Sequence, residues 1–161
     1  MLVSTEVKLI DGLNVRLVSS DSGLRAIEFE PWRPVEGGQH GIHPTASEAV
    51  RQLRAYFAGQ LRRFDLPLDM QGTPFQLSVW RELERIPYGE TRSYSQIAAA
   101  IGAPRAVRAV GAANGANPIP IVVPCHRVIG TGGKLVGYGG GLPLKKRLLE
   151  LEGTRALPLG Y

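Results

Sequence analysis

The chain contains a single cysteine, Cys125, which is followed directly by His126 and Arg127. One thiol cannot form a disulfide within the chain, and it cannot share a metal site with a second cysteine. Two interpretations remain: a buried apolar side chain, which is common for free cysteines, or a nucleophile. A cysteine attacks as the thiolate, which needs a base or positive charge nearby. The two residues after Cys125 therefore favour the nucleophile.

The segment before the thiol predicts how that nucleophile is held. Pro118, Pro120 and Pro124 restrict the backbone and would place the thiol on a stiff loop. The apolar residues between them, 119–123, also fit a buried strand, which would raise the pKa of the thiol unless His126 and an acid compensate. In an extended segment the side chains of neighbouring residues point to opposite faces, so the base would need a turned backbone or a bridging water. Glu152, after the apolar helix expected over 144–151, is a candidate acid, although spacing does not single it out.

Charge is unevenly distributed along the chain. The formal net charge is +5, and residues 73–153 hold ten Lys or Arg against five Asp or Glu, while the rest holds nine of each. This asymmetry is typical of a half that faces a polyanion such as nucleic acid, and a solvated basic surface is the alternative. The composition is that of a globular protein. Residues 1–10 lack the apolar core of a secretory signal, and no stretch is long enough to span a bilayer, so we expect a soluble cytoplasmic protein.

The first part of the chain predicts a small sheet with one helix. Short apolar runs over residues 3–29, separated by Asp-Gly and Asp-Ser-Gly, indicate antiparallel hairpins. Residues 31–44 read as a loop. A helix follows, capped by Thr45 or Ser47 and ending near Gly59. We therefore expect a domain over residues 1–60 and a linker over 61–72.

The second part, residues 73–161, predicts helices. Thr73-Pro74 and Ser93 are helix starts, and Gly102-Ala103-Pro104 ends the second helix. Another helix is expected over Arg105–Asn114, so the pair fits a helix-turn-helix, although many bundles contain such pairs. Arg105 and Arg108 would lie on one face of that helix. Its other residues are small or apolar, which would let its backbone approach a partner closely.

The run Pro124-Cys125-His126-Arg127, within residues 118–128, resembles the alkyl-acceptor signature of the O6-alkylguanine-DNA alkyltransferases. The resemblance covers residues 73–153 strongly and residues 1–60 only in size and pattern. It implies an α+β fold, with an α/β unit of ribonuclease H-like type followed by a helical domain that contains the helix-turn-helix. The supporting matches are Phe75-Gln76, Val79-Trp80, Ile86 to Gly89, Ser93-Tyr94, Arg108 to Gly111, Asn117-Pro118, Gly137-Tyr138 and Leu148 to Glu152.

The resemblance also implies an activity, which is repair of DNA by transfer of an alkyl group, mainly methyl, from O6 of guanine, and also from O4 of thymine, to Cys125. His126 would deprotonate the thiol through a water, and Glu152 would orient the histidine. Tyr94 would protonate the departing guanine, and Asn117 would brace the turn before the cysteine. No residue of this set could hydrolyse the thioether product, so each molecule would react once, without a cofactor.

The implied partner is double-stranded DNA, bound through the minor groove by a monomer that can act cooperatively. Arg108 would fill the gap left by the flipped nucleotide, because a base inside the stack shields its alkyl carbon. The other implied DNA contacts are Arg105, Ser93, Tyr94, Ala109, Gly111 and Arg127. The implied alkylguanine pocket is lined by Val128, Tyr138, Gly139, Gly140 and Gly141.

Two departures from the family pattern bear on the prediction. Some relatives carry zinc in the N-terminal domain, but this chain has no cysteine there, and His40 and His43 are a weak pair, so we expect no metal. Gly139 stands where some relatives have serine. Two alternatives to an alkyltransferase are a lesion-binding module without an acceptor, against which Cys125 argues, and a helix-turn-helix regulator in which Cys125 only packs.

Overall fold

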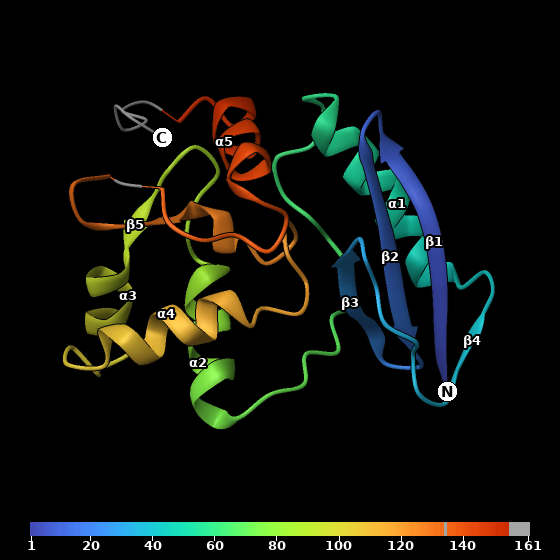
Figure 1. The fold of residues 1–161 in the computed structure, drawn as a ribbon, viewed down its shortest axis with the longest axis horizontal. Helices are drawn as coiled ribbons and strands as arrows, with labels where there is room; N and C mark the ends of the chain where they lie inside the picture. Colours follow the sequence, from blue (N-terminus) through green and yellow to red (C-terminus); the bar gives the residue numbers. More distant parts are fainter. Residues whose placement is uncertain (134, 155–161) are drawn as a thin grey trace. The chain divides into compact units, whose positions relative to one another are not determined.

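The computed structural model describes residues 1–133 and 135–154, and its chain divides into two compact units after Gln71. Figure 1 shows the elements of each unit. Within the described ranges, no helix combines the length and the apolar character needed to cross a membrane. The two units are described in turn.

The first unit is built on a four-stranded sheet of order β3-β2-β1-β4. The predicted hairpins are confirmed as β1 (Leu2–Ile10), β2 (Leu13–Ser20) and β3 (Gly23–Phe29), which are antiparallel neighbours. The loop expected over 31–44 contains a further strand, β4 (Gly38–His40), parallel to β1. Its sequence, Gly-Gln-His, has no apolar alternation, so the pattern that predicts strands could not find it.

Helix α1 (Pro44–Phe57) begins earlier than either expected cap would allow. The N-cap is His43, whose Nδ1 accepts from the backbone N–H of Thr45, so the expectation of Thr45 or Ser47 as the cap was wrong. Proline at the first helical position suits this earlier start, because its missing N–H has no partner there anyway. One face of the helix is buried in the core, through Ala46, Ala49, Leu53 and Tyr56.

The segment predicted as a linker is largely part of the first unit. The backbone N–H of Leu24 donates to Pro67 O at 2.8 Å, and that of Asp69 donates to Leu24 O at 2.8 Å. Through these bonds the segment pairs with the outer edge of β3. The first domain therefore extends to Gln71 rather than ending near residue 60.

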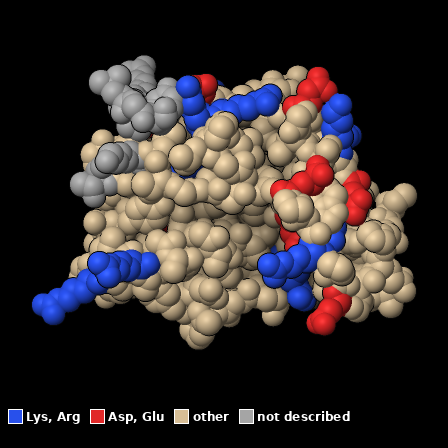
Figure 2. All heavy atoms as spheres, viewed as in Figure 1, with Lys and Arg blue, Asp and Glu red and all other residues tan. Residues whose placement is uncertain are grey.

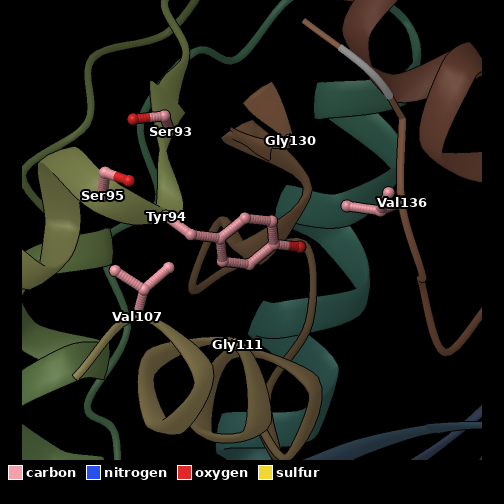
Figure 3. A pocket seen from close by; sticks show the side chains of 7 residues that line it. All are labelled: Ser93, Tyr94, Ser95, Val107, Gly111, Gly130 and Val136. Atoms are coloured by element: carbon pink, nitrogen blue, oxygen red, sulfur yellow. The ribbon is translucent and has the colours of Figure 1, made fainter. Parts of the chain in front are cut away.

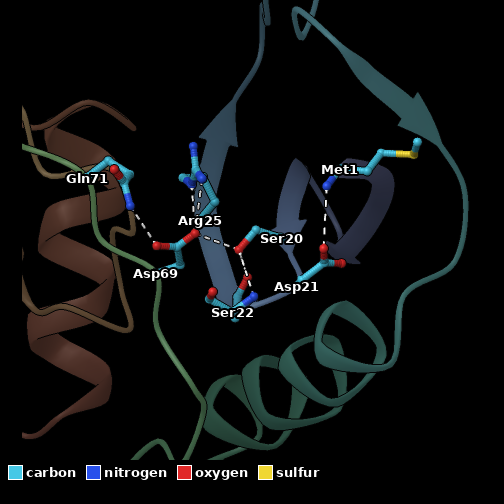
Figure 4. A network of polar contacts seen from close by, with 8 residues as sticks. Met1, Ser20, Asp21, Ser22, Arg25, Asp69 and Gln71 are labelled. Carbon is cyan, nitrogen blue, oxygen red and sulfur yellow. Dashed lines mark hydrogen bonds and ion pairs between the residues drawn. The ribbon is translucent and has the colours of Figure 1, made fainter.

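A polar network holds the end of this segment (Figure 4). The Asp69 carboxylate accepts from Ser20 Oγ at 2.6 Å and from the Arg25 guanidinium at 3.0 and 3.1 Å. Gln71 donates to its other oxygen at 2.7 Å. Hydrogen bonding by Ser20 lowers the pKa of Asp69 despite partial burial, so the carboxylate is charged at neutral pH.

The second unit is helical, as predicted. Thr73 and Ser93 each cap a helix in a capping box, the first with Gln76 and the second with Gln96. The elements are α2 (Pro74–Leu83), β5 (Arg92–Ser93), α3 (Tyr94–Ala100), α4 (Val107–Gly115), a 3-10 turn (Cys125–Arg127), β6 (Val128–Ile129), a second 3-10 turn (Thr131–Gly133) and α5 (Leu142–Leu151).

The helix-turn-helix pair is α3 and α4, but α4 begins later than expected. Arg105 lies before the helix, because Ala106 at the N-cap has φ −92° and ψ 35° and no side chain caps the first turn. Arg105 and Arg108 therefore do not share a helix face. Both side chains are exposed, at and just before the first turn of α4.

Residues 119–123, for which a buried strand was one alternative, are largely buried but form a turn, in which Ile121 has φ +74°. Next to this turn, two short parallel strands position residues of the candidate site. Strand β6 directly follows the cysteine turn and pairs with β5, which directly precedes Tyr94. The pairing brings the start of α3 beside the cysteine turn. Neither two-residue strand has a recognisable sequence pattern.

Candidate active site

Cys125 begins a tight 3-10 turn in which all three residues are buried. The residue is 6% exposed, and its backbone N–H donates to Val123 O at 2.8 Å. The backbone is therefore turned, which is the arrangement that a base one residue away requires. No direct hydrogen bond joins the thiol to His126 among the described residues.

The fully buried His126 is paired with a buried carboxylate. Its Nε2 lies 2.7 Å from Oε2 of Glu152, the C-cap of α5. Arg127 binds the same carboxylate, with Nε 2.7 Å from Oε1 and a terminal nitrogen 3.1 Å from Oε2. The structure thus selects Glu152 as the acid that spacing could not single out.

Arg127 was expected on the DNA surface, and that expectation was wrong. The residue is 7% exposed. Besides Glu152, it binds Ile86 O at 2.7 Å, and its guanidinium lies 5.7 Å from the centre of the Tyr88 ring. With both the carboxylate and a carbonyl as partners, it fixes the position of Glu152 and has no face available to a phosphate.

The charges of this cluster follow from its contacts. Burial would raise the pKa of Glu152, but hydrogen bonds from His126 and Arg127 outweigh it and hold the pKa at about 2. Burial lowers the pKa of His126. The neighbouring Glu152 raises it, but only enough to offset part of that decrease. At neutral pH the carboxylate is therefore charged and the imidazole neutral. In that state Nε2–H donates to Glu152, and the lone pair sits on Nδ1, which is buried and makes no hydrogen bond within the described chain.

The thiol itself is protonated at rest. Burial raises the pKa of Cys125, and the Asn117 side chain and the charge of Lys145 counteract this only in part. A neutral imidazole one residue away is therefore needed to generate the thiolate.

Asn117 bridges the turn that leads to the cysteine. Its Nδ2 donates to Val123 O at 2.8 Å, and its Oδ1 accepts from the Ile119 N–H at 3.0 Å. One side chain thus ties both ends of the turn that contains the positive φ of Ile121. This is the arrangement that the resemblance implied for Asn117.

Lys145, one of the ten Lys and Arg residues of 73–153, is completely buried. Its Nζ donates to Val128 O at 2.7 Å and to Val136 O at 2.9 Å, and burial lowers its pKa to about 8. A signal for this placement exists in the sequence. Lys145, Leu148, Leu149 and Glu152 are spaced i, i+3, i+4 and i+7, so they share one helix face.

A cavity of about 250 Å³ opens beside Tyr94 (Figure 3). Tyr94 extends into it from the start of α3, across Gly111 of α4. Burial and the neighbouring Cys125 raise the pKa of Tyr94, so its hydroxyl keeps its proton at neutral pH. The full lining is Ser93, Tyr94, Ser95, Val107, Gly111, Gly130 and Val136.

The residues predicted to form the alkylguanine pocket do not line this cavity. Val128 is fully buried and its carbonyl is bound by Lys145. The hydroxyl of Tyr138 is also buried, and burial raises its pKa well above the usual value. Gly139 and Gly140 lie just before α5, with Gly139 exposed. The lining of the cavity instead includes three residues predicted as DNA contacts, Ser93, Tyr94 and Gly111.

The start of α4 presents an exposed basic surface. Arg105, Arg108 and Ala109 are exposed, and no ion pair involves either arginine within the described ranges. Lys and Arg side chains project from the molecule where Figure 1 places the connection between α3 and α4 (Figure 2). A small residue beside two free guanidinium groups leaves room for a nucleic-acid backbone.

The two histidines of the first unit that were considered as metal ligands have other contacts. His43 caps α1, and His40 Nδ1 lies 3.2 Å from Ser4 Oγ. Among the described residues, no group of three His, Cys, Asp or Glu side chains is placed to hold a metal ion.

Buried His126 makes the stability of the fold depend on pH. Its pKa lies below the usual 6.5 in the folded chain, so the unfolded chain binds more protons as the pH falls. We expect the free energy of unfolding to decrease from pH 7 to pH 5, and a second loss below about 4.5 as the protonation of Glu152, whose folded pKa is about 2, begins to favour unfolding. Urea denaturation across this range measures both. His126→Gln should flatten the first segment, and a parent curve that is flat from pH 7 to 5 would contradict the assignment.

Comparison with known proteins bears on both units. Residues 14–70 match the family model "6-O-methylguanine DNA methyltransferase, ribonuclease-like domain", and residues 74–154 match "6-O-methylguanine DNA methyltransferase, DNA binding domain". A methylated-DNA–protein-cysteine methyltransferase of Mycobacterium tuberculosis is 57% identical over 141 residues, covering 84% of this chain and 81% of that protein. The constitutive enzyme of Bacillus subtilis is 56% identical over 127 residues, covering 78% and 77%.

A solved structure agrees with these matches in fold. The crystal structure of Mycobacterium tuberculosis OGT in complex with DNA superimposes with a TM-score of 0.85 at 50% identity, covering 93% of this chain and 92% of that one. The agreement extends over both units, including the first, for which the sequence resemblance was only in size and pattern. The chain belongs to the 6-O-methylguanine DNA methyltransferase family, the O6-alkylguanine-DNA alkyltransferases that its cysteine motif resembles.

Proposed function

We propose that Cys125 is the acceptor in the repair that this family performs, the direct and irreversible transfer of an alkyl group from O6 of guanine in DNA to a cysteine of the protein. One observation supports this assignment above all others. The chain has one cysteine, and that cysteine begins a turn whose next residue is a neutral imidazole paired with a carboxylate. A lone packing cysteine requires no such partner.

The proposed transfer uses the neutral His126 as base. Nδ1 takes the thiol proton through a water, since the two groups share no direct hydrogen bond, and Glu152 stabilises the imidazolium that forms. Sγ then attacks the alkyl carbon, so that the S–C bond forms as the C–O6 bond breaks. Tyr94 donates its hydroxyl proton to the departing guanine, which would otherwise leave as an anion. Neither water nor these side chains can cleave the C–S bond of the thioether, so the protein acts once.

Mass measurement tests the assignment. After incubation with a duplex that contains O6-methylguanine, the peptide with Cys125 should gain the mass of one methylene, while all other peptides keep theirs. A chain that remains unmodified while the methyl group leaves the DNA would overturn it.

We further propose that α4 enters the minor groove and that Arg108 fills the gap left by the flipped nucleotide. The exposed guanidinium at the first turn of α4, next to the exposed Ala109, supports this placement. Arg105, outside the helix, is assigned to a phosphate. Repair of O4-alkylthymine, binding as a monomer with cooperativity along DNA, and a cytoplasmic location stay predictions.

Replacing Arg108 with alanine should slow repair of duplex DNA by about tenfold or more and leave the reaction with free O6-benzylguanine nearly unchanged, because only the duplex requires flipping. Single-turnover rates with both substrates measure the difference. Arg105→Ala is the matched control, and it should weaken duplex binding and reduce its salt dependence. Equal losses on duplex and free base after Arg108→Ala would rule out the gap-filling role.

A further inference from the structure

Asn114 is a buried polar residue near Tyr94 and the backbone of Cys125. It lies on α4 and is 6% exposed. Gly111, one turn earlier, faces the Tyr94 ring, and an added Cβ there would be in ordinary contact with Tyr94 Cδ1 at 4.0 Å. Figure 3 shows Tyr94 lying over Gly111. Residues three apart share a helix face, so Asn114 lies on the face of α4 that packs against Tyr94.

The amide of Asn114 acts on both neighbours. Its Nδ2 lies 3.4 Å from the backbone oxygen of Cys125, which places α4 against the cysteine turn. Its side chain also interacts with the Tyr94 hydroxyl, where it lowers the pKa that burial and Cys125 raise. An amide lowers the pKa of a phenol by donating N–H to the phenolic oxygen. The two hydrogens of Nδ2 therefore suffice for one contact to each neighbour.

The amide oxygen of Asn114, Oδ1, makes no contact in the described chain that would stabilise the fold. Oδ1 of Asn114 is buried and has no hydrogen-bond partner within the described residues. A buried acceptor without a donor costs about 1–3 kcal/mol, and leucine of nearly the same shape would avoid that cost. A side chain whose presence destabilises the core needs a reason other than packing.

We propose that Asn114 is a positioning residue for the transfer: it holds the Tyr94 hydroxyl toward the departing guanine and links that hydroxyl to the turn that carries Cys125. As the proton leaves Tyr94, the amide N–H compensates the charge that remains on the phenolic oxygen. One side chain thus sets the distance between the proton donor and the nucleophile. The inference rests on the proposed role of Tyr94 as proton donor.

The test is a double-mutant cycle of Asn114→Leu and Tyr94→Phe, read as single-turnover rates with free O6-benzylguanine so that DNA binding does not enter. We expect Tyr94→Phe to slow transfer about 100-fold and Asn114→Leu about tenfold, in the range of positioned acids. The double variant should be as slow as Tyr94→Phe alone, because Asn114 acts through the hydroxyl. Asn114→Asp, which offers no N–H, should not restore the rate.

Stability separates this role from a structural one. Asn114→Leu should keep or raise the midpoint of urea unfolding while it slows transfer, whereas a packing role would lower both. Gly115→Ala is the matched control in the same helix turn, since an added Cβ there meets nothing within 4 Å, and it should leave the rate unchanged.

The outcomes distinguish the two proposals. If Tyr94→Phe leaves the rate unchanged, the proposed role of Tyr94 fails. If Tyr94→Phe slows transfer but Asn114→Leu does not, or if the two losses multiply in the double variant, the role of Asn114 fails while that of Tyr94 stands.

Discussion

Replacing Cys125 with serine is expected to abolish alkyl transfer and leave DNA binding intact. The hydroxyl fits the space of the thiol, but its oxygen is a far weaker nucleophile near neutral pH, even beside a neutral imidazole. The basic surface at the start of α4 is untouched by the change, so affinity for duplex DNA should persist. We expect alkyl transfer to be lost completely, because the described chain has no second thiol to accept the group.

Two measurements separate loss of chemistry from loss of fold. Transfer is followed by the methyl group that remains in a labelled O6-methylguanine duplex, and binding by titration of the same duplex at two salt concentrations. Cys125→Ala should behave in the same way, which excludes an effect of the serine hydroxyl. Residual transfer by either variant would assign the acceptor role elsewhere, and loss of binding in both would require the site to be redrawn.

Features that depend on local sequence were predictable, and features that depend on pairing between distant segments were not. Thr73 and Ser93 cap their helices because a hydroxyl three residues before a glutamine suffices to form a capping box. Strand β4 exists only because the edge of β1 is free to pair, and β6 only because β5 lies beside it. No local pattern encodes such pairing.

The residues of the site were predicted better than their surroundings. The types Cys125, His126 and Glu152 were selected by chemistry and resemblance, and the structure places the last two 2.7 Å apart. The resemblance placed Arg127 among the DNA contacts, and Lys145 was counted only as one of the basic residues of the second half. Arg127 is held by the Glu152 carboxylate at the end of α5, and Lys145 by the carbonyls of Val128 and Val136. Helix spacing indicates the buried face of Lys145, but it does not display these partners.

The buried Glu152 carboxylate leads to the second large effect. Glu152→Gln should slow transfer by about 100-fold and lower the free energy of unfolding by about 3–5 kcal/mol. The amide cannot stabilise an imidazolium as a carboxylate does, so His126 becomes a poorer base. The substitution also leaves the buried Arg127 guanidinium without a negative partner. This unpaired charge accounts for the larger part of the loss in stability.

Single-turnover rates and urea unfolding measure the two losses separately. Glu150→Gln, two residues away and half exposed in a pair with Lys146, is the control, and it should change stability by less than about 1 kcal/mol. Combining Glu152→Gln with Arg127→Met removes the unpaired charge and should recover most of the stability but not the rate. Recovery of the rate as well would show that Glu152 serves only to neutralise Arg127, because the histidine would then work without a carboxylate.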